Sequence, residues 1–231
     1  MSKHLERELE YLQQDILKLA REVEGAITNA IRALQERNVA LAREVIAGDN
    51  EIDLLENRVE EECLKTLALH QPVAVDLRRI AAILKINADL ERMADLAVDI
   101  AERAVRLTDL TAISVPEKLQ RMTNATTEMV RQSLEAFFYL DVRLARRVCQ
   151  CDDEVDRLNS EIIQELLQIM CSFSEKIEPA LSLFSATRHL ERIADHATNI
   201  AEDVIYLVEG EIVRHRPEAI WSKGEQGAKR G

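Results

Sequence analysis

Apolar residues recur at spacings of three and four along most of the chain, which is the pattern of an amphipathic helix. The clearest run opens the sequence and comprises Leu5, Leu9, Leu12, Ile16, Leu19, Val23, Ile27, Ala30, Ile31 and Leu34. These side chains would line one face, because each helical residue advances about 100° around the axis. The run therefore predicts one long helix over residues 4–37.

Interruptions of the apolar pattern divide the rest of the chain into further helices. A short helical piece, Val39–Ala47, is expected to end at Gly48, with Asp49 as the N-cap of a second helix over 50–69. The sequence His70-Gln71-Pro72 should end that helix, because proline cannot continue it. The remaining helices are expected over residues 73–107, 116–139, 152–173 and 179–208. The chain is therefore predicted to be all-α.

The second half of the sequence repeats the first. An offset of 103 residues aligns segment 49–55 with 152–158, and an offset of 100 aligns 90–102 with 190–202. Nine of the thirteen positions in the second alignment are identical, which indicates an internal duplication. Because the offset changes between the two alignments, a three-residue deletion should lie in or near the loop between the aligned helices.

The duplication predicts two tandem three-helix bundles related by a pseudo-two-fold axis, one over residues 1–110 and one over 111–210. Residues 211–231 would form a charged tail, which we expect to be poorly ordered beyond Trp221. Composition agrees with helical bundles, since aromatic residues make up only 3% of the chain and Gly and Pro number only 6 and 4.

The formal net charge of −12 argues against nucleic acid as the main partner, because neutralising phosphates requires clustered Lys and Arg. No apolar run approaches the ~20 residues of a membrane span, and residues 1–12 lack the apolar core of a signal peptide. We therefore expect a cytoplasmic protein. The four cysteines contain no Cys-x-x-Cys pair, so buried or half-buried free thiols are expected.

Acidic residues gather on one face of the predicted third helix. With Glu91 as the origin of a helical wheel, Asp95 lies at about 40°, Asp99 at about 80° and Glu102 at about 20°. Apolar residues occupy the opposite arc. The matching positions of the second repeat are Glu191, Asp195, Asn199 and Glu202. Further carboxylates line the preceding helix of each unit, at Asp49, Asp53, Asp152 and Asp156.

A stripe of carboxylates has two interpretations, a solvated helix face and a cation site. Like charges four residues apart destabilise a helix by roughly 0.2–0.5 kcal/mol per pair. Here no Lys relieves the stripe, Arg92 and Arg106 lie only at its edge, and the stripe recurs in both repeats. Facing carboxylates on two neighbouring helices would offer oxygen ligands, which suit hard ions such as Mg²⁺, Mn²⁺ and Fe³⁺. The pattern therefore favours a metal site.

The sequence contains no recognisable catalytic constellation, so we do not expect an enzyme. A ferritin-like di-iron site would need Glu-x-x-His pairs on the acidic face, and His196 would point away from that face. His70 and His189 have no His or Cys partner at ligand spacing and are expected to be surface or capping residues. A Gly-rich phosphate loop and a Ser-His-Asp order are also missing from the sequence.

Three segments resemble the PhoU family of phosphate-transport regulatory proteins. They are Gly48-Asp49-x-x-Ile52-Asp53-x-Leu55-Glu56, His70-Gln71-Pro72-Val73-Ala74-x-Asp76-Leu77-Arg78, and Leu84-Lys85-Ile86 followed by Asp89-Leu90-Glu91-Arg92-Met93-Ala94-Asp95. The copy at residues 190–195 matches as well, so the resemblance covers about residues 5–210.

This resemblance implies a PhoU-like pair of three-helix bundles in which Glu/Asp-x-x-x-Asp motifs hold metal ions, with iron and zinc among the metals. It also implies a cytoplasmic and often dimeric protein that represses the phosphate-starvation response. The implied partners are the phosphate-specific ABC transporter, through its ATPase, and the associated phosphate-sensing histidine kinase.

The resemblance also assigns candidate ligands. The first motif falls on Glu91, Asp95 and Asp99, and the second on Glu191, Asp195 and Asn199. The ligands approaching from the neighbouring helices would be Asp49, Asp53, Asp152 and Asp156. Asn199 stands where the first repeat has a carboxylate, so the second site should bind a cation less strongly. Asp53 stands where relatives often have Asn, which should favour the first site.

Three functions remain to be separated. The first is a non-enzymatic negative regulator of phosphate uptake and phosphate-starvation signalling that binds metals and protein partners. The alternative is a metal-dependent hydrolase or a metal-storage helical protein, and the third is a plain helical scaffold without metal. The residues do not distinguish iron, zinc, manganese and magnesium, and they do not specify the number of ions or the partner surface.

Overall fold

The computed structural model describes residues 3–210, and every regular element in that range is helical. The six α-helices are α1 (Lys3–Glu36), α2 (Val39–His70), α3 (Val75–Thr108), α4 (Glu117–Tyr139), α5 (Val142–Ser172) and α6 (Ile177–Glu209), with a 3₁₀ turn η1 (Ser174–Lys176) before α6. The predicted tail 211–231 lies outside the described residues. None of the described helices is long and apolar enough to cross a membrane.

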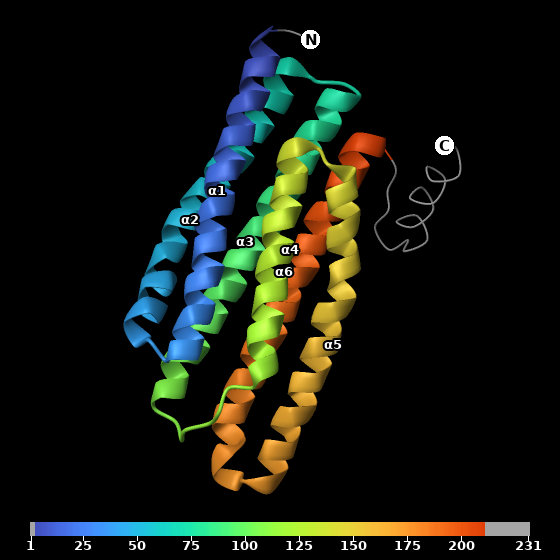
Figure 1. Cartoon of the computed structure of the whole chain (residues 1–231). Helices are drawn as coiled ribbons and strands as arrows, with labels where there is room; N and C mark the ends of the chain where they lie inside the picture. The colour runs from blue at the N-terminus through green and yellow to red at the C-terminus, as the bar shows by residue number, and fades with distance from the viewer. Residues whose placement is uncertain (1–2, 211–231) are drawn as a thin grey trace, which may run out of the picture.

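The helices form two three-helix units, α1–α3 and α4–α6, which confirms the predicted fold class (Figure 1). Helices α3 and α6 lie at the centre and pack against each other, whereas α2 packs on α1 and α3, and α5 packs on α4 and α6. Helices α2 and α5 therefore form opposite edges of the molecule. Matching apolar positions of the central helices are completely buried, at Leu90, Met93, Ile100, Leu190, Ile193 and Ile200.

Two of the predicted helix boundaries are wrong. Helix α2 runs without interruption through Gly48, and Asp49 is therefore an interior residue and not an N-cap. The cap is Asn38, whose side chain accepts a hydrogen bond from Leu41 N. A glycine inside a helix costs about 1 kcal/mol, and the buried apolar face of α2 on both sides of Gly48 outweighs that cost.

Helix α5 was expected to begin at Asp152, but it begins ten residues earlier, at Val142. Asp141 caps it by accepting hydrogen bonds from Arg143 N at 2.9 Å and Leu144 N at 3.0 Å. Such a cap satisfies backbone donors that the helix itself leaves unpaired. The acidic segment around Asp152 is therefore the middle of a helix.

The three-residue deletion is divided between two helix ends. Each unit has four residues between its last two helices, 71–74 and 173–176, so the loops have equal length. Relative to the aligned carboxylates Asp53 and Asp156, α5 ends one residue earlier than α2. Relative to Glu91 and Glu191, α6 begins two residues later than α3.

Polar contacts cross the antiparallel seam between α3 and α6. Lys85 Nζ lies 2.7 Å from Asp203 Oδ1 at one end of the seam, and Arg106 Nη2 lies 3.1 Å from Glu178 Oε1 at the other. Nearer the centre, Asp89 contacts α6 residues, and Asp99 Oδ2 lies 3.7 Å from His189 Nδ1. These contacts fix the register of the two units against each other.

The cysteine prediction is only half correct. Cys63 is buried and Cys149 is half-buried, whereas Cys151 and Cys171 are exposed. Burial, together with neighbouring carboxylates, raises the pKa of both the Cys63 and the Cys149 thiol to about 12. These two thiols are therefore protonated at neutral pH and unreactive as nucleophiles.

Candidate functional site

The structure brings four of the predicted ligands of the first repeat to one side of the α2–α3 pair. Asp49 and Asp53 on α2 lie close enough to Glu91 and Asp95 on α3 for charges on the two helices to interact. Burial raises the pKa of Asp49, and the charges of Asp53 and Asp95 raise it further. Burial and then Asp95 raise the pKa of Glu91, with smaller contributions from Glu56 and Asp53.

Two other residues organise this first cluster. Arg92 contacts both carboxylates of α3, with Nη1 at 3.1 Å from Asp95 Oδ2 and Nε at 3.4 Å from Glu91 Oε2. Buried Asn87 donates to Glu56 Oε1 at 3.0 Å and thereby holds a fifth carboxylate at the edge of the cluster. Glu56 belongs to the acidic stripe of α2 but was not among the predicted ligands.

The second repeat places Asp152 and Asp156 of α5 opposite Glu191 and Asp195 of α6. Burial, together with the charges of Asp156 and Asp195, raises the pKa of Asp152 to about 6. Burial, followed by Asp156, also raises the pKa of Asp195. Arg188 Nη1 binds Glu191 Oε1 at 2.8 Å, whereas the buried Glu191 Oε2 has no hydrogen-bond partner.

The remaining two predicted ligands lie at the α3–α6 seam and not in the clusters. Asn199 donates to Asp89 Oδ1 at 3.2 Å, and His196 Nδ1 lies 2.7 Å from the same oxygen. Asp99 contacts His189 of α6. The lower cation affinity predicted for the second site stays a prediction, but in this structure Asn199 is engaged by another residue.

The donors of both clusters fit a hard cation by their chemistry but not by their spacing in this structure. All eight facing side chains are carboxylates, and burial followed by their mutual repulsion raises the pKa values of five of them. A bound cation would remove that repulsion and supply a partner for Glu191 Oε2. Within residues 3–210, no three His, Cys, Asp or Glu side chains lie close enough together to hold one ion.

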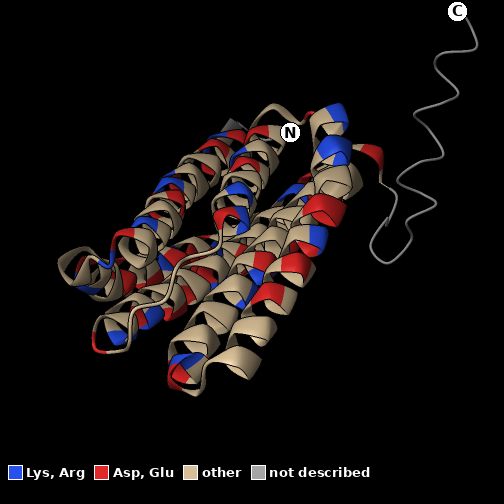
Figure 2. Cartoon of the chain, turned by 60° about the horizontal axis from the view of Figure 1, so that its bottom comes forward, with Lys and Arg blue, Asp and Glu red and all other residues tan. Residues whose placement is uncertain are grey.

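Acidic and basic residues are interleaved along the helices (Figure 2). Helix α2 carries eight acidic and three basic residues, and α6 carries six and two. Helix α3, by contrast, carries six of each. Four surface hollows lie elsewhere, and none of the ten predicted ligands lines them. The clusters therefore lie on helix faces outside these four hollows.

Comparison with known proteins gives the family. The PhoU domain model matches residues 16–104 and again 119–204, one match in each helical unit. The chain belongs to the PhoU family. It is 44% identical over 219 residues to the phosphate-specific transport system accessory protein PhoU homolog of Aquifex aeolicus, covering 95% of this chain and 98% of that protein.

Solved PhoU structures have the same fold. The crystal structure of PhoU from Pseudomonas aeruginosa superposes with a TM-score of 0.87 at 37% identity, covering 89% of this chain and 99% of that one. The phosphate transport system regulatory protein PhoU from Streptococcus pneumoniae gives 0.84 at 30% identity, covering 90% and 99%. The predicted resemblance to the PhoU family is thus confirmed.

The raised pKa of Asp152 in this PhoU-family chain predicts a pH dependence of stability. Its folded pKa of about 6 exceeds the ordinary 3.8, so folding favours the protonated form. Stability should therefore fall as pH rises from about 4 to about 6 and remain lower above that range. In chelator, Asp152→Asn should flatten this part of the profile and raise the free energy of unfolding at pH 7 by about 1–2 kcal/mol, after allowance for solvent screening.

The measurement is urea unfolding between pH 4 and 8, followed by circular dichroism. Asp153→Asn is the matched control, because Asp153 is an exposed neighbour on the same helix. Identical pH profiles for the two variants would contradict the assignment of the effect to the buried cluster.

Proposed function

We propose that this chain is a non-enzymatic, cytoplasmic regulator of phosphate uptake that acts negatively on phosphate-starvation signalling. Membership of the PhoU family carries the proposal, since its relatives are accessory proteins of phosphate-specific transport systems. The partners would be the ATPase of a phosphate ABC transporter and a phosphate-sensing histidine kinase, and the working form would be a homodimer. Contact with the membrane would be indirect, through these partners.

The carboxylate clusters support a cation-binding role within this function. Asp49, Asp53, Glu91 and Asp95 would hold ions on the first repeat. Asp152, Asp156, Glu191 and Asp195 would hold them on the second. Oxygen ligands favour magnesium, manganese or ferric iron over zinc, which more often takes nitrogen and sulfur. When bound, the metal would supply positive charge that neutralises these helix faces and thereby changes which surfaces a partner can approach.

The geometry favours regulation over hydrolysis. The clusters lie on helix faces, whereas a catalytic site is usually a concave pocket that excludes water. Arg92 and Arg188 hold carboxylates of both clusters in ion pairs, which is compatible with a structural or sensing role. A metal-dependent hydrolase or a metal-storage protein is the alternative that the experiment below must separate.

The test is association of the purified full-length chain with the transporter ATPase and with the sensor region of the kinase, in chelator and in Mn²⁺. We expect binding at micromolar concentration, and light scattering should give twice the monomer mass for the chain alone. Failure of both associations in both conditions would refute the regulatory proposal. Turnover of a phosphate ester that disappears on changing Asp95 and Asp195 to alanine would favour the hydrolase.

A further inference from the structure

The two ends of the seam between α3 and α6 correspond to each other through the duplication. The 100-residue offset relates Lys85 to Ser185 and Asp203 to Arg103. At one end, Lys85 Nζ lies 2.7 Å from Asp203 Oδ1, so a cation meets a carboxylate across the seam. At the other end the same two positions hold a hydroxyl and a guanidinium. That second pair therefore contains a cation but no anion.

Neighbouring contacts place Arg103 of α3 opposite Ser185 of α6. Asp99 and His189 face each other across the seam, with Oδ2 3.7 Å from Nδ1. Arg103 lies one turn after Asp99, and Ser185 lies one turn before His189. Because the two helices are antiparallel, these turns come together. Ser185 Oγ is also 3.0 Å from His189 Nε2, which fixes its position along the seam.

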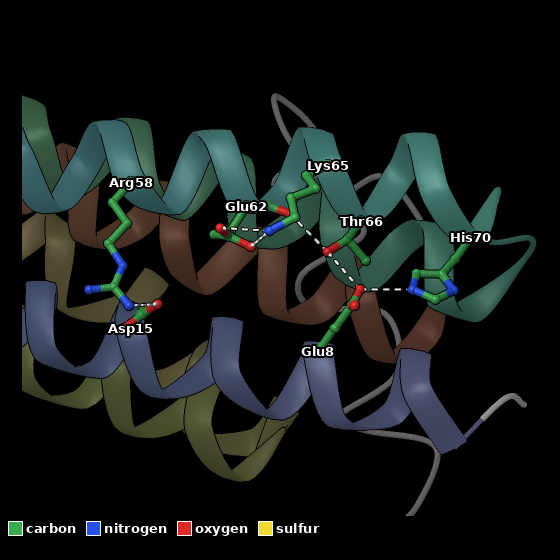
Figure 3. A network of polar contacts seen from close by, with 7 residues as sticks. All are labelled: Glu8, Asp15, Arg58, Glu62, Lys65, Thr66 and His70. Carbon is green, nitrogen blue, oxygen red and sulfur yellow. Dashed lines mark hydrogen bonds and ion pairs between the residues drawn. The ribbon is translucent and has the colours of Figure 1, made fainter.

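Arg103 is a half-buried cation without a partner. Within residues 3–210 its guanidinium has neither a hydrogen bond nor an ion pair, and its Nε atom is shielded from solvent. Two more exposed cations do meet carboxylates, as Figure 3 shows for Arg58, 3.7 Å from Asp15, and for Lys65, 3.2 Å from Glu62. Shielding a charge without pairing it is costly, because the lost hydration is not replaced. An anion beside Arg103 would remove that cost.

A second guanidinium lies near the same place. Arg192 is exposed, follows His189 by three residues on α6 and has no ion pair in the described part of the chain. Burial lowers the pKa of His189, Asp99 opposes this shift, and the charges of Arg103 and Arg192 add to it. Both guanidiniums are therefore close enough to the imidazole ring to act on it.

The hydroxyl of Ser185 completes the set of donors. At 3.7 Å, Asp99 Oδ2 is too far from His189 Nδ1 for a hydrogen bond, so Asp99 does not hold the ring proton on Nδ1. With that proton on Nε2, the ring donates to Ser185 Oγ, and the Ser185 O–H is free to donate to another group. One hydroxyl and two guanidiniums then surround the same point of the seam.

We propose that Arg103, Ser185 and Arg192 bind the phosphate group of a small molecule, either inorganic phosphate or a phosphomonoester. Guanidinium groups bind phosphate through paired, charge-assisted hydrogen bonds. A tetrahedral anion offers oxygens to donors arriving from both helices, whereas a carboxylate offers two oxygens in one plane. Asp99 opposes the anion with a single charge, against the two charges of the guanidiniums.

Such a site would connect the two helical units, because its donors come from α3 and from α6. It goes beyond the proposed function and does not depend on the carboxylate clusters or on metal. Association with partner proteins tests the regulatory proposal separately, so failure of anion binding would leave that proposal intact.

The test is titration of the full-length, metal-free chain at constant ionic strength with sodium phosphate, glycerol 3-phosphate or acetate. Calorimetry gives the affinities, and NMR of the Arg103 Nε–H resonance locates the binding. We expect saturable binding of phosphate or the phosphomonoester and weaker binding of acetate. Arg103→Gln should weaken phosphate binding about tenfold or more, because a charge-assisted contact is lost. The matched control is Arg106→Gln, which should leave binding unchanged, since Arg106 already meets Glu178 at 3.1 Å.

A second variant supplies the anion from the chain itself. Ser185→Asp would place a carboxylate opposite Arg103, as Asp203 stands opposite Lys85 at the other end of the seam. It should abolish phosphate binding and raise the melting temperature by about 2–4 °C. Leu181→Asp adds the same charge one turn earlier, at a position that is 50% exposed, and should do neither.

Circular dichroism checks that all four variants are folded. Equal phosphate affinities of Arg103→Gln and Arg106→Gln, or phosphate binding retained in Ser185→Asp, would overturn the proposal. Acetate binding as tight as phosphate binding would also overturn it, by making the site a carboxylate site. So would the lack of any shift of the Arg103 resonance at about 50 mM phosphate, since the dissociation constant would then exceed any useful range.

Discussion

Replacement of Leu190 by alanine is expected to lower the free energy of unfolding by about 3–4 kcal/mol. Leu190 has no exposed surface and lies on α6, which packs against α3, α4 and α5 together. Truncation would leave a cavity surrounded by long helices, and these cannot close around it without disturbing several interfaces at once. The effect is therefore expected near the upper half of the usual range for leucine truncation.

Urea unfolding of the metal-free protein measures this loss, which should appear as a lower midpoint with an unchanged dependence on denaturant. Val208→Ala is the matched control, because Val208 lies on the same helix but is 45% exposed. That change should cost less than about 0.5 kcal/mol. A similar loss in both variants would show that α6 is not the centre of the fold.

Neutralising two facing carboxylates of the second cluster should have opposite effects with and without metal. In chelator, Asp152→Asn/Asp195→Asn removes a repulsion between partly buried groups, so the free energy of unfolding should rise. In Mn²⁺ the same change removes two of the four carboxylates proposed as ligands. We expect cation affinity at this site to fall by about 100-fold or more, because charge count largely sets such affinities.

Thermal unfolding across a Mn²⁺ titration measures both the stability without metal and the stabilisation by metal in the same variant. The native chain should gain about 2–3 kcal/mol at a metal concentration 100 times the dissociation constant, and the variant should lose the share contributed by its second site. Asp153→Asn/Glu154→Gln carries the same charge change outside the cluster and should behave like the native chain. If metal does not stabilise the native chain, the clusters are solvated helix faces and the cation proposal fails.

Most of the fold could be predicted from the sequence because helix periodicity and duplication are local signals that agree with each other. The two boundary errors share a physical cause. Gly48 and the acidic run at Asp152 are weak helix-stop or helix-start signals on their own, and burial of the flanking apolar residues overrides them. The N-cap residues Asn38 and Asp141 mark where α2 and α5 actually begin.

The site was predictable only in part, for a different reason. A helical wheel gives the direction of a side chain around its own helix but not which neighbouring helix lies there. Asp99 lies about 80° from Glu91 on the wheel, far enough for it to reach α6 and not α2. Asn199 lies at the equivalent angle on α6, and its side chain therefore reaches Asp89 of α3. Glu56 and Asn87 could have been found from the acidic stripe and from a polar residue on an apolar helix face.

The contacts at the seam between α3 and α6 bear on how such a chain can arise from two copies of one unit. The 100-residue offset relates Asp89 to His189 and Asp99 to Asn199. The contacts Asp99–His189 and Asp89–Asn199 therefore lie at equivalent positions of the two units. Two identical copies of the first unit would place Asp against Asp at both contacts and would repel each other. Joining the copies in one chain allowed each position to diverge alone, so that histidine and asparagine now meet the two acids. Fusion thus made possible a complementary pairing that a symmetric assembly of that unit does not permit.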